Sequence, residues 1–550
     1  ITTQERTVQM ASAVTATPER VCSFEPSVWD DFFIHYEPQP LKTSEDCLRA
    51  KAQKLQEDVQ MLFQTFTSVV QKMNLIDTLQ RLGIDHLFED QINTTMNEIH
   101  KKEFDSCSLY DVALRFRLLR ERGLWVSPDV FSKFKGKDGR LNRDIISEPM
   151  GLLSLYNAAY LSIPGESELD EAIVFARHHL ESMRGSINYP FSEQVKRNLE
   201  IPLPRTLKRL DAPYYIAEYQ QEKAYNPSIL ELAKLDFNLL QRLHQEELKA
   251  FCRWGSDLYE EVRLTYSRHR IVECYFWSYT EYYERHYGDA RIILAKLLVL
   301  ATLLDDTFDM HATLEEGRKL NEAIQRWDES AIPLLPEYLK RYFVRLMNTF
   351  KEFEDEVKPD HKYRVAYSTK AFQNLCKHYQ QESEWFHSSH IPSFEDHVKC
   401  SIISAGTPTL FVGSLVGMGD EASKEAFEWA IGCTDAVRAC AEVARFMDDL
   451  ASFKHGKNKF DVASSIESYI NQHHCTDEVA MDVLDNLVED AWKTTNQARF
   501  DRGALLPLVN RAANFTKSMT LLFRNKCDRY TFSRGNKDRI QQQFVHPIPL

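Results

Sequence analysis

Apolar and charged positions interleave at helical spacing along most of the chain. The spacing is clear from Glu45 to Asn74 and returns in one segment after another up to Arg529, before an irregular end from Tyr530. In the first half of the chain the later segments cover residues 76–100, 109–121, 146–161, 168–183, 192–198 and 206–225. No segment alternates with the period of a strand, and no Asn-Gly pair marks a hairpin. The pattern predicts an all-α protein.

The helical pattern breaks before the middle of the chain, at Asn226-Pro227-Ser228. Asparagine is a favourable N-cap and proline fits the first turn of a helix, so a new helix is expected to begin here. We therefore predict two helical domains, residues 21–226 and 227–550. Residues 1–20 are polar, with two acidic residues and two arginines. They predict a disordered tail rather than a plastid transit peptide.

One segment has almost no polar side chains. From residue 292 to 304 every position is apolar or small except Lys296 and Thr302. The run is shorter than the roughly 20 residues that cross a bilayer, so we interpret it as a helix at the centre of a soluble core. The sequence Asp305-Asp306-Thr307-Phe308-Asp309 follows it. Carboxylates at this end of a helix meet its partial negative charge, at a cost of about 0.3–1 kcal/mol each, which predicts a bound cation.

The same arrangement occurs a second time. Residues 430–447 are mostly apolar and predict another buried helix, which ends in Asp448-Asp449 with Ser452 one turn later. Two such helices facing each other across a pocket would hold hard divalent cations such as Mg²⁺ between them. The predicted metal ligands are Asp305, Asp306 and Asp309 on one wall and Asp448, Asp449 and Ser452 on the other.

Three arginines accompany the acidic segments. Arg268 and Arg270 precede the first one, and Arg445 lies three residues before Asp448. Guanidinium groups bind phosphate oxygens with two parallel hydrogen bonds, and the chain has no Gly-rich phosphate loop. The pattern therefore favours a diphosphate held by metal and arginine over a nucleotide. Trp277 adds an aromatic face, which stabilises a nearby cation by about 0.5–2 kcal/mol.

Composition narrows the range of partners and compartments. The 550 residues carry a net charge of −14, which argues against nucleic acid and anionic membranes as main partners. Eleven cysteines are scattered without a CxxC pair, as is typical of reduced thiols in the cytosol. No run of 18 apolar residues predicts a membrane span.

Several stretches occur together in a recognisable order. They are FEPSVWDDFF (24–33), GLLSLYNAAYL (151–161), LELAKLDFNLLQ (230–241), RIVECYFW (270–277), LLDDTFD (303–309) and the closing FVHPIPL (544–550). Because it contains these stretches in this order, the chain resembles plant terpene synthases of the sesquiterpene type. The resemblance implies an N-terminal relict α-barrel and a C-terminal class I isoprenoid-synthase helical bundle. The N-terminal half has no DxDD stretch, so protonation-initiated cyclisation is not expected.

The resemblance also implies a mechanism. A Mg²⁺-dependent enzyme would ionise farnesyl diphosphate, cyclise the carbocation and release diphosphate, with three ions expected and Mn²⁺ as an alternative metal. Arg268, Arg270 and Arg445 would clamp the diphosphate. Trp277 and Tyr530 would steer the cation, and residues 524–536, which include Asp528, would close as a lid. The expected protein is a cytoplasmic monomer that binds a prenyl diphosphate.

The chain departs from the family pattern at three positions. The second metal motif usually ends in a glutamate, where this chain has Gly456; His269 stands where an aspartate is usual, and Phe523 where a tyrosine is frequent. Gly456 leaves two alternatives open: an active enzyme in which water or a neighbour completes the site, or a catalytically impaired protein that only binds prenyl diphosphates. A third alternative is a synthase that also accepts geranyl diphosphate.

Overall fold

The computed structural model describes residues 24–40, 43–455 and 462–550. Across these ranges the regular structure is helical, and the only β-type pairing is an isolated bridge between Lys135 and Leu141. The all-α prediction is confirmed. The predicted tail at residues 1–20 and the departure at Gly456 lie outside the described residues.

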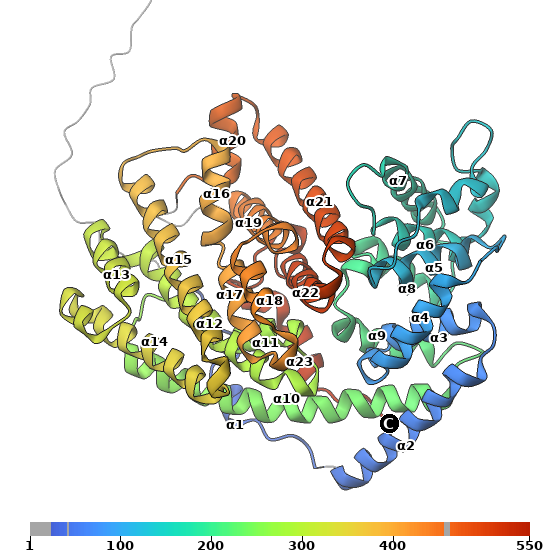
Figure 1. Ribbon diagram of the computed structural model, residues 1–550, viewed down its shortest axis with the longest axis horizontal. Coiled ribbons are helices and arrows are strands. Elements are labelled where there is room, and N and C mark those ends of the chain that lie inside the picture. The colour runs from blue at the N-terminus through green and yellow to red at the C-terminus, as the bar shows by residue number, and fades with distance from the viewer. Residues whose placement is uncertain (1–23, 41–42, 456–461) are drawn as a thin grey trace, which may run out of the picture.

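The N-terminal helices enclose their own hydrophobic core and form one side of the molecule (Figure 1). They are α2 (Glu45–Thr65), α3 (Val69–Arg81), α4 (Glu89–Lys101), α5 (Leu109–Glu121), α6 (Pro149–Ala159), α7 (Ser167–Ser182), α8 (Phe191–Glu200) and α9 (Lys208–Tyr219). The central helices α5 and α6 pack against each other and bury Phe116 and Leu155 completely. The short helix α1 (Phe32–His35) does not join this core, since Phe33 packs in the C-terminal one.

The long helix α10 (Pro227–Val262) links the two halves and runs along both of them (Figure 1). It begins where the sequence predicted a helix start, because Asn226 accepts hydrogen bonds from the N–H groups of Ser228 (2.9 Å) and Ile229 (3.2 Å). The first turns of α10 pack in the N-terminal core and its later turns, with Leu248, pack in the C-terminal core. The two hydrophobic cores therefore share one continuous helix.

The C-terminal helices form a bundle around α12, which is central in Figure 1. They are α11 (Ile271–Glu281), α12 (Gly288–Asp306), α13 (Leu314–Arg326), α14 (Glu337–Glu356), α15 (Lys362–His387), α16 (Phe394–Ser404), α17 (Thr407–Ser414), α18 (Lys424–Ile431), α19 (Asp435–His455), α20 (Ser465–His473), α21 (Asp477–Asp501), α22 (Leu506–Leu522) and α23 (Lys537–Phe544). Leu294, Leu300 and Leu303 of α12 are fully buried, as the apolar run predicts. Lys296 reaches the edge of the core and pairs with Glu352 at 3.2 Å.

A π-helical turn extends the end of α12. Residues Thr307–His311 adopt this wider turn, and the N–H of Ala312 donates to the carbonyl of Thr307 at 2.7 Å. Single π turns inside or next to α-helices are frequent at functional sites. Here the turn carries Asp309 onto the same cavity as Asp305.

The helix predicted over residues 430–447 is wrong at both ends. The backbone leaves the helix after Ile431, and Cys433 and Asp435 have positive φ angles of 47° and 36°, so α19 begins only at Asp435. The helix also continues past Asp448 and Asp449 to His455. The second acidic pair therefore lies within a helix rather than at its end, and Asp449 accepts a hydrogen bond from the Ser465 N–H outside α19 at 2.7 Å.

One stretch of the described chain, Phe394–Gly417, is long and apolar enough to span a membrane by length and composition alone, but 83% of its most apolar window is buried in the bundle. It is not one continuous helix. Gly406, with a φ of 78°, separates α16 from α17. Pro408 follows within the first turn of α17.

Candidate active site

The two acidic segments open onto one cavity of about 350 Å³. It is lined by Asp305 and Asp309 from the end of α12 and its π turn, by Asp448, Asp449 and Ser452 from α19, and by Asp528 from the loop after α22. Arg268 and Arg445 lie on its rim. The structure thus brings together most of the residues that the sequence singled out, and we call this cavity the acidic mouth.

Asp306 is the exception on the first wall, since it does not line the acidic mouth. Its side chain is only 1% exposed. The carboxylate accepts hydrogen bonds from the Ser267 hydroxyl (2.8 Å) and the Arg268 backbone N–H (2.7 Å), and it pairs with the Arg268 guanidinium at 2.9 Å. In this conformation Asp306 positions the segment that carries Arg268, and its predicted role as a metal ligand stays a prediction.

Arg268 bridges the first wall and the loop after α22. Its Nη2 atom donates to Asp305 at 2.7 Å and its Nη1 atom to the hydroxyl of Thr531 at 2.9 Å. Burial opposes the charge, but Asp306 and Asp305 hold the pKa of the guanidinium well above its usual value. A permanent cation therefore sits against Asp305 at the rim of the cavity.

Arg270 does not line the acidic mouth. Its side chain is 1% exposed, and the guanidinium donates to the backbone carbonyls of Glu25 (2.7 Å), Tyr530 (3.2 Å) and Thr531 (2.6 Å). It thus fastens the N-terminal segment and the loop after α22 to the start of α11. Direct binding of diphosphate by Arg270 remains a prediction.

Two neighbouring carboxylates on the second wall have pKa values shifted in opposite directions. Burial opposes the charge of Asp449, but Arg445 and His397 and the N–H of Ser465 (2.7 Å) hold its pKa well below the usual range. Burial raises the pKa of Asp448 to about 7, although Arg445 pairs with it at 3.2 Å, and the nearby carboxylates add to the shift. Asp448 therefore faces a mutual repulsion that a bound cation would relieve.

A smaller chamber of about 130 Å³ lies beneath the acidic mouth and shares Asp305, Asp448 and Asp528 with it. Its walls are largely apolar or aromatic and include Trp277, Leu298, Tyr379, Leu410, Met519, Phe523 and Tyr530. The rings of Trp277 and Tyr530 meet edge to face, with centroids 5.5 Å apart.

The loop that carries Tyr530 is fixed from two sides. Asp528 accepts the backbone N–H groups of Tyr530 and Thr531, both at 2.9 Å, which closes a tight turn. The Tyr530 hydroxyl lies within hydrogen-bond distance of the Thr302 hydroxyl and of the Cys274 thiol. These contacts place its ring against the chamber, as the sequence predicts for an aromatic wall.

Two family models match this chain with its acidic, arginine-lined mouth and aromatic chamber. Residues 256–494 match the family described as "Terpene synthase family, metal binding domain", and residues 28–199 match "Terpene synthase, N-terminal domain". The chain belongs to the terpene synthase family.

Relatives of this terpene synthase match over nearly their whole length. The tau-cadinol synthase of Zea mays is 55% identical over 535 residues, which cover 96% of this chain and 98% of that protein. The alpha-copaene synthase of the same species is 53% identical, covering 95% and 99%.

Solved structures share the fold of this terpene synthase. A limonene synthase with 2-fluorolinalyl diphosphate superposes with a TM-score of 0.88 at 29% identity, covering 96% of this chain and 99% of that one. The isoprene synthase of grey poplar, in complex with three Mg²⁺ ions and dimethylallyl-S-thiolodiphosphate, gives 0.84 at 29% identity, covering 95% and 99%. The predicted two-domain terpene synthase architecture is confirmed.

The metal-binding domain of this terpene synthase implies the use of a divalent metal, and the residues present fit one. Carboxylate and hydroxyl oxygens are ligands of hard cations, and Asp305, Asp309, Asp448, Asp449 and Ser452 supply such oxygens to the acidic mouth. Across the described ranges no three His, Cys, Asp or Glu side chains converge on a single point. Ions held here would therefore complete their shells with oxygens from water and from a bound diphosphate.

One contact of the N-terminal segment of this terpene synthase was not predicted from the sequence. Glu273 of α11 is 4% exposed and accepts a hydrogen bond from the Ser27 hydroxyl at 2.8 Å. Next to it, the Val28 N–H donates to the Ser533 hydroxyl at 3.2 Å. The signal was visible in the sequence, since Glu273 is the only charged residue in the apolar run 271–277.

Proposed function

We propose that this terpene synthase is a sesquiterpene synthase: it ionises farnesyl diphosphate with the help of Mg²⁺, cyclises the carbocation and releases diphosphate. The observation that carries the proposal is the position of the acidic mouth directly above an aromatic chamber, with Asp305, Asp448 and Asp528 common to both. The Zea mays relatives named tau-cadinol and alpha-copaene synthase, 55% and 53% identical, support it.

The proposed metal set is three Mg²⁺ ions, with Mn²⁺ as a substitute. Asp305 and Asp309 would hold ions on one wall, and Asp448, Asp449 and Ser452 on the other, all from side chains that line the acidic mouth. The complex of the grey poplar isoprene synthase, which contains three Mg²⁺ ions and a diphosphate analogue, supports this count. When bound, such ions neutralise the charge that develops on the leaving diphosphate.

Arg268 and Arg445 supply the protein's own contribution to diphosphate binding. Both line the rim, and both are now paired with carboxylates that the proposal assigns to metal binding. Once those carboxylates act as ligands, the guanidinium groups can turn to the diphosphate oxygens, for which their fork geometry is suited. In the proposed complex the diphosphate thus takes the place of these ion pairs.

The chamber serves the hydrocarbon chain and the carbocation. Trp277, Tyr379 and Tyr530 line the chamber, and their ring faces favour a positive charge. Arg270 and Glu273 hold the N-terminal segment and the loop after α22 over this region. Exclusion of water matters because water would end the reaction early by forming an alcohol.

We also propose that the protein acts as a cytoplasmic monomer. Ten cysteines of the described chain form no disulfide, as expected in a reducing compartment. The net charge of −14 favours a soluble, separate protein.

The test is to incubate the purified protein with Mg²⁺ and, separately, with geranyl, farnesyl and geranylgeranyl diphosphate, and to identify products by gas chromatography with mass detection. The expected result is a cyclic C15 product from farnesyl diphosphate, absent in EDTA and strongly reduced in Asp305→Asn. Products from geranyl diphosphate alone would contradict the sesquiterpene proposal. Binding of a diphosphate analogue without any product would favour the catalytically impaired alternative.

A further inference from the structure

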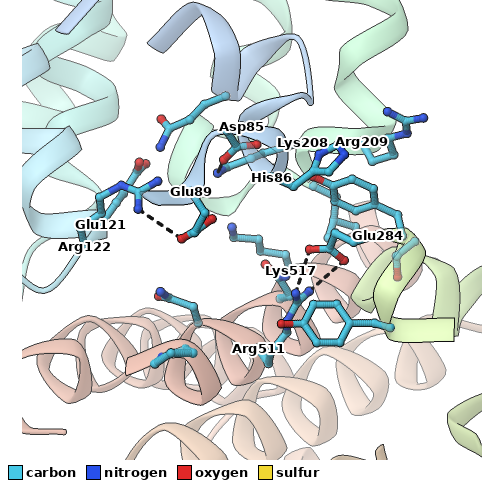
Figure 2. Close-up of a pocket in the computed structure, with 18 of the residues that line it drawn as sticks. Asp85, His86, Glu89, Glu121, Arg122, Lys208, Arg209, Glu284, Arg511 and Lys517 are labelled. Carbon is cyan, nitrogen blue, oxygen red and sulfur yellow. Dashed lines mark hydrogen bonds and ion pairs between the residues drawn. The ribbon is translucent and has the colours of Figure 1, made fainter. Parts of the chain in front are cut away.

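A second and larger cavity, of about 520 Å³, lies between the two domains and shares no lining residue with the acidic mouth. Figure 2 shows it, with side chains of the N-terminal domain above and helices of the C-terminal domain below. The N-terminal side includes Asp85, Glu121 and Lys208, and the C-terminal side includes Arg499 and Lys517. Nothing in the proposed reaction uses this cavity.

The carboxylates that line this interdomain cavity already have partners. Asp85 accepts from Lys208 (2.6 Å), Glu89 pairs with Arg122 (3.4 Å), Glu121 with Arg117 (3.4 Å) and Glu284 with Arg511 (2.8 Å), and Glu421 accepts from the Tyr287 hydroxyl (2.8 Å). The negative charge of the cavity is therefore largely compensated.

Two cations that line the cavity form no close ion pair in the described parts of the chain. Lys517 of α22 projects into the space between the domains (Figure 2), and Arg499 of α21 is 5% exposed. Within the described parts of the chain neither has a carboxylate within 4.0 Å, and Arg499 donates only to the neutral side chains of Asn510 (3.1 Å) and Asn496 (2.6 Å). A cation as deeply buried as Arg499 usually has an anionic partner.

The pKa values agree with this geometry. Burial, together with the charges of Lys208 and Arg499, lowers the pKa of Lys517 to about 7, and Glu121 and Asp85 offset this only in part. Burial lowers the pKa of Arg499 to about 10, although the charge of Glu121 opposes the shift. An anion between them would stabilise both charged forms.

A helix terminus adds to the positive potential. The N-cap residue Leu207 and the first residues of α9, Lys208–Leu210, all line the cavity. Leu207 offers no capping side chain. The positive end of the helix dipole therefore borders the cavity that Lys517 also lines, an arrangement that favours anions.

We propose that the interdomain cavity binds a small, protonated oxyanion of the phosphate class between Lys517, Arg499 and the N-terminus of α9. The carboxylates of Glu89 and Glu121 line the same space. They accept a hydrogen bond from an oxyanion that carries a proton, whereas they repel one that carries none. The ligand is therefore phosphate-like rather than sulfate. It contacts both domains, so its binding strengthens their association.

The ligand has two chemical sources, free inorganic phosphate and the diphosphate released by the synthase reaction. Isothermal titration of the full chain in EDTA, at constant ionic strength, with phosphate, diphosphate and sulfate in separate experiments distinguishes them. EDTA removes the metal on which diphosphate binding in the acidic mouth depends. We expect phosphate or diphosphate to bind with one site per chain and sulfate to give no measurable binding.

Lys517→Gln should weaken this binding about tenfold or more, since it removes a charge-assisted hydrogen bond. Lys340→Gln is the matched control, because it removes the same charge from a surface pair with Glu337 far from the cavity. Asp305→Asn should leave the binding unchanged. Equal affinity in wild type and Lys517→Gln, loss of binding in Asp305→Asn, or an equal response to sulfate would each overturn the proposal, as would no binding at all.

Asn510→Asp provides a second variant that is expected to fold. Asn510 already accepts the N–H of Arg499, so the substitution places the missing negative charge inside the cavity without a change of shape. We expect it to raise the thermal midpoint in the absence of phosphate and to lower the affinity for the oxyanion about tenfold. A lower midpoint together with unchanged affinity would contradict an uncompensated cationic site.

Discussion

At the scale of single residues, the adjacent carboxylates of Asp305 and Asp306 have different surroundings and different roles. Asp305 lines both the acidic mouth and the chamber, whereas Asp306 is buried behind the wall with Ser267 and Arg268. We predict that Asp305→Asn lowers turnover about 10²–10³-fold, since it removes charge needed around the leaving diphosphate. Its thermal midpoint should stay close to that of wild type.

The neighbouring substitution Asp306→Asn is the control. It leaves buried donors of Ser267 and Arg268 poorly satisfied, so the free energy of unfolding should fall by about 1–3 kcal/mol. The Mg²⁺ concentration for half-maximal rate should rise in Asp305→Asn and change little in Asp306→Asn. Equal metal dependence in the two variants would show that both carboxylates bind metal.

A second residue-scale prediction concerns pH. Glu281 of α11 is fully buried, and neither of its carboxylate oxygens has a hydrogen-bond partner within normal geometry in the described chain. Burial raises its pKa to about 8, and Ser518, Arg511 and Lys517 offset this only in part. Since the folded pKa lies above the unfolded one, the native state binds the proton more tightly. This contribution is complete below about pH 4.5 and is lost as the pH rises towards 8.

Glu281→Gln removes this dependence because the amide stays neutral. We expect it to stabilise the protein near pH 8 relative to wild type, by an amount on the order of 4 kcal/mol at most, and to have little effect near pH 5. Chemical denaturation at several pH values measures the difference. A constant difference across that range would exclude titration of Glu281 as its cause.

At the scale of elements, the N-terminal segment is tied to α11 by short polar contacts over the active site. Ser27→Ala removes the hydrogen bond to Glu273, worth about 0.5–1.5 kcal/mol. We predict faster hydrogen exchange in residues 24–36 and a larger share of alcohol among the products, because water enters more readily. Gas chromatography of the product mixture gives that share directly.

Ser44→Ala serves as the matched substitution for this test. Ser44 caps α2 by accepting the N–H of Cys47 at 3.4 Å and lies outside the active site. Its loss should reduce stability without changing the ratio of alcohol to hydrocarbon. A similar ratio in Ser27→Ala, Ser44→Ala and wild type would mean that the segment does not exclude water.

The elements also show what the sequence could predict. The apolar run before Asp305 identified a buried helix, because few other structures accommodate so many apolar side chains. The π turn after it was not predictable, since one wider turn leaves no mark in a helical pattern. That turn carries Asp309 onto the cavity, whereas contacts with Ser267 and Arg268 hold Asp306 behind the wall. The buried position of Arg270 was not predictable either, because its partners at Glu25 and Thr531 are distant in sequence.

At the scale of the whole molecule, the two domains meet through a mixture of buried and exposed polar contacts. Asn496 of α21 is 3% exposed and donates to the carbonyls of Tyr160 (3.1 Å) and Ser162 (2.9 Å) in the N-terminal domain. Lys493, one turn earlier, pairs with Asp170 at 2.7 Å in a more exposed position. The buried contact should contribute more, because exposed ion pairs are screened by solvent and stabilise by about 0–1 kcal/mol.

We therefore predict that Asn496→Ala weakens the association of the domains by about 1–3 kcal/mol, since it leaves two buried carbonyls without a donor. A chain of two domains need not unfold in one step, so calorimetry should show the first transition at lower temperature or separated from the second. Asp170→Asn, which breaks only the exposed pair, should leave the profile almost unchanged. The product from farnesyl diphosphate should be the same in both variants, because neither residue lines the acidic mouth or the chamber. Identical transitions in Asn496→Ala and Asp170→Asn would mean that apolar packing along α10, rather than this contact, holds the domains together.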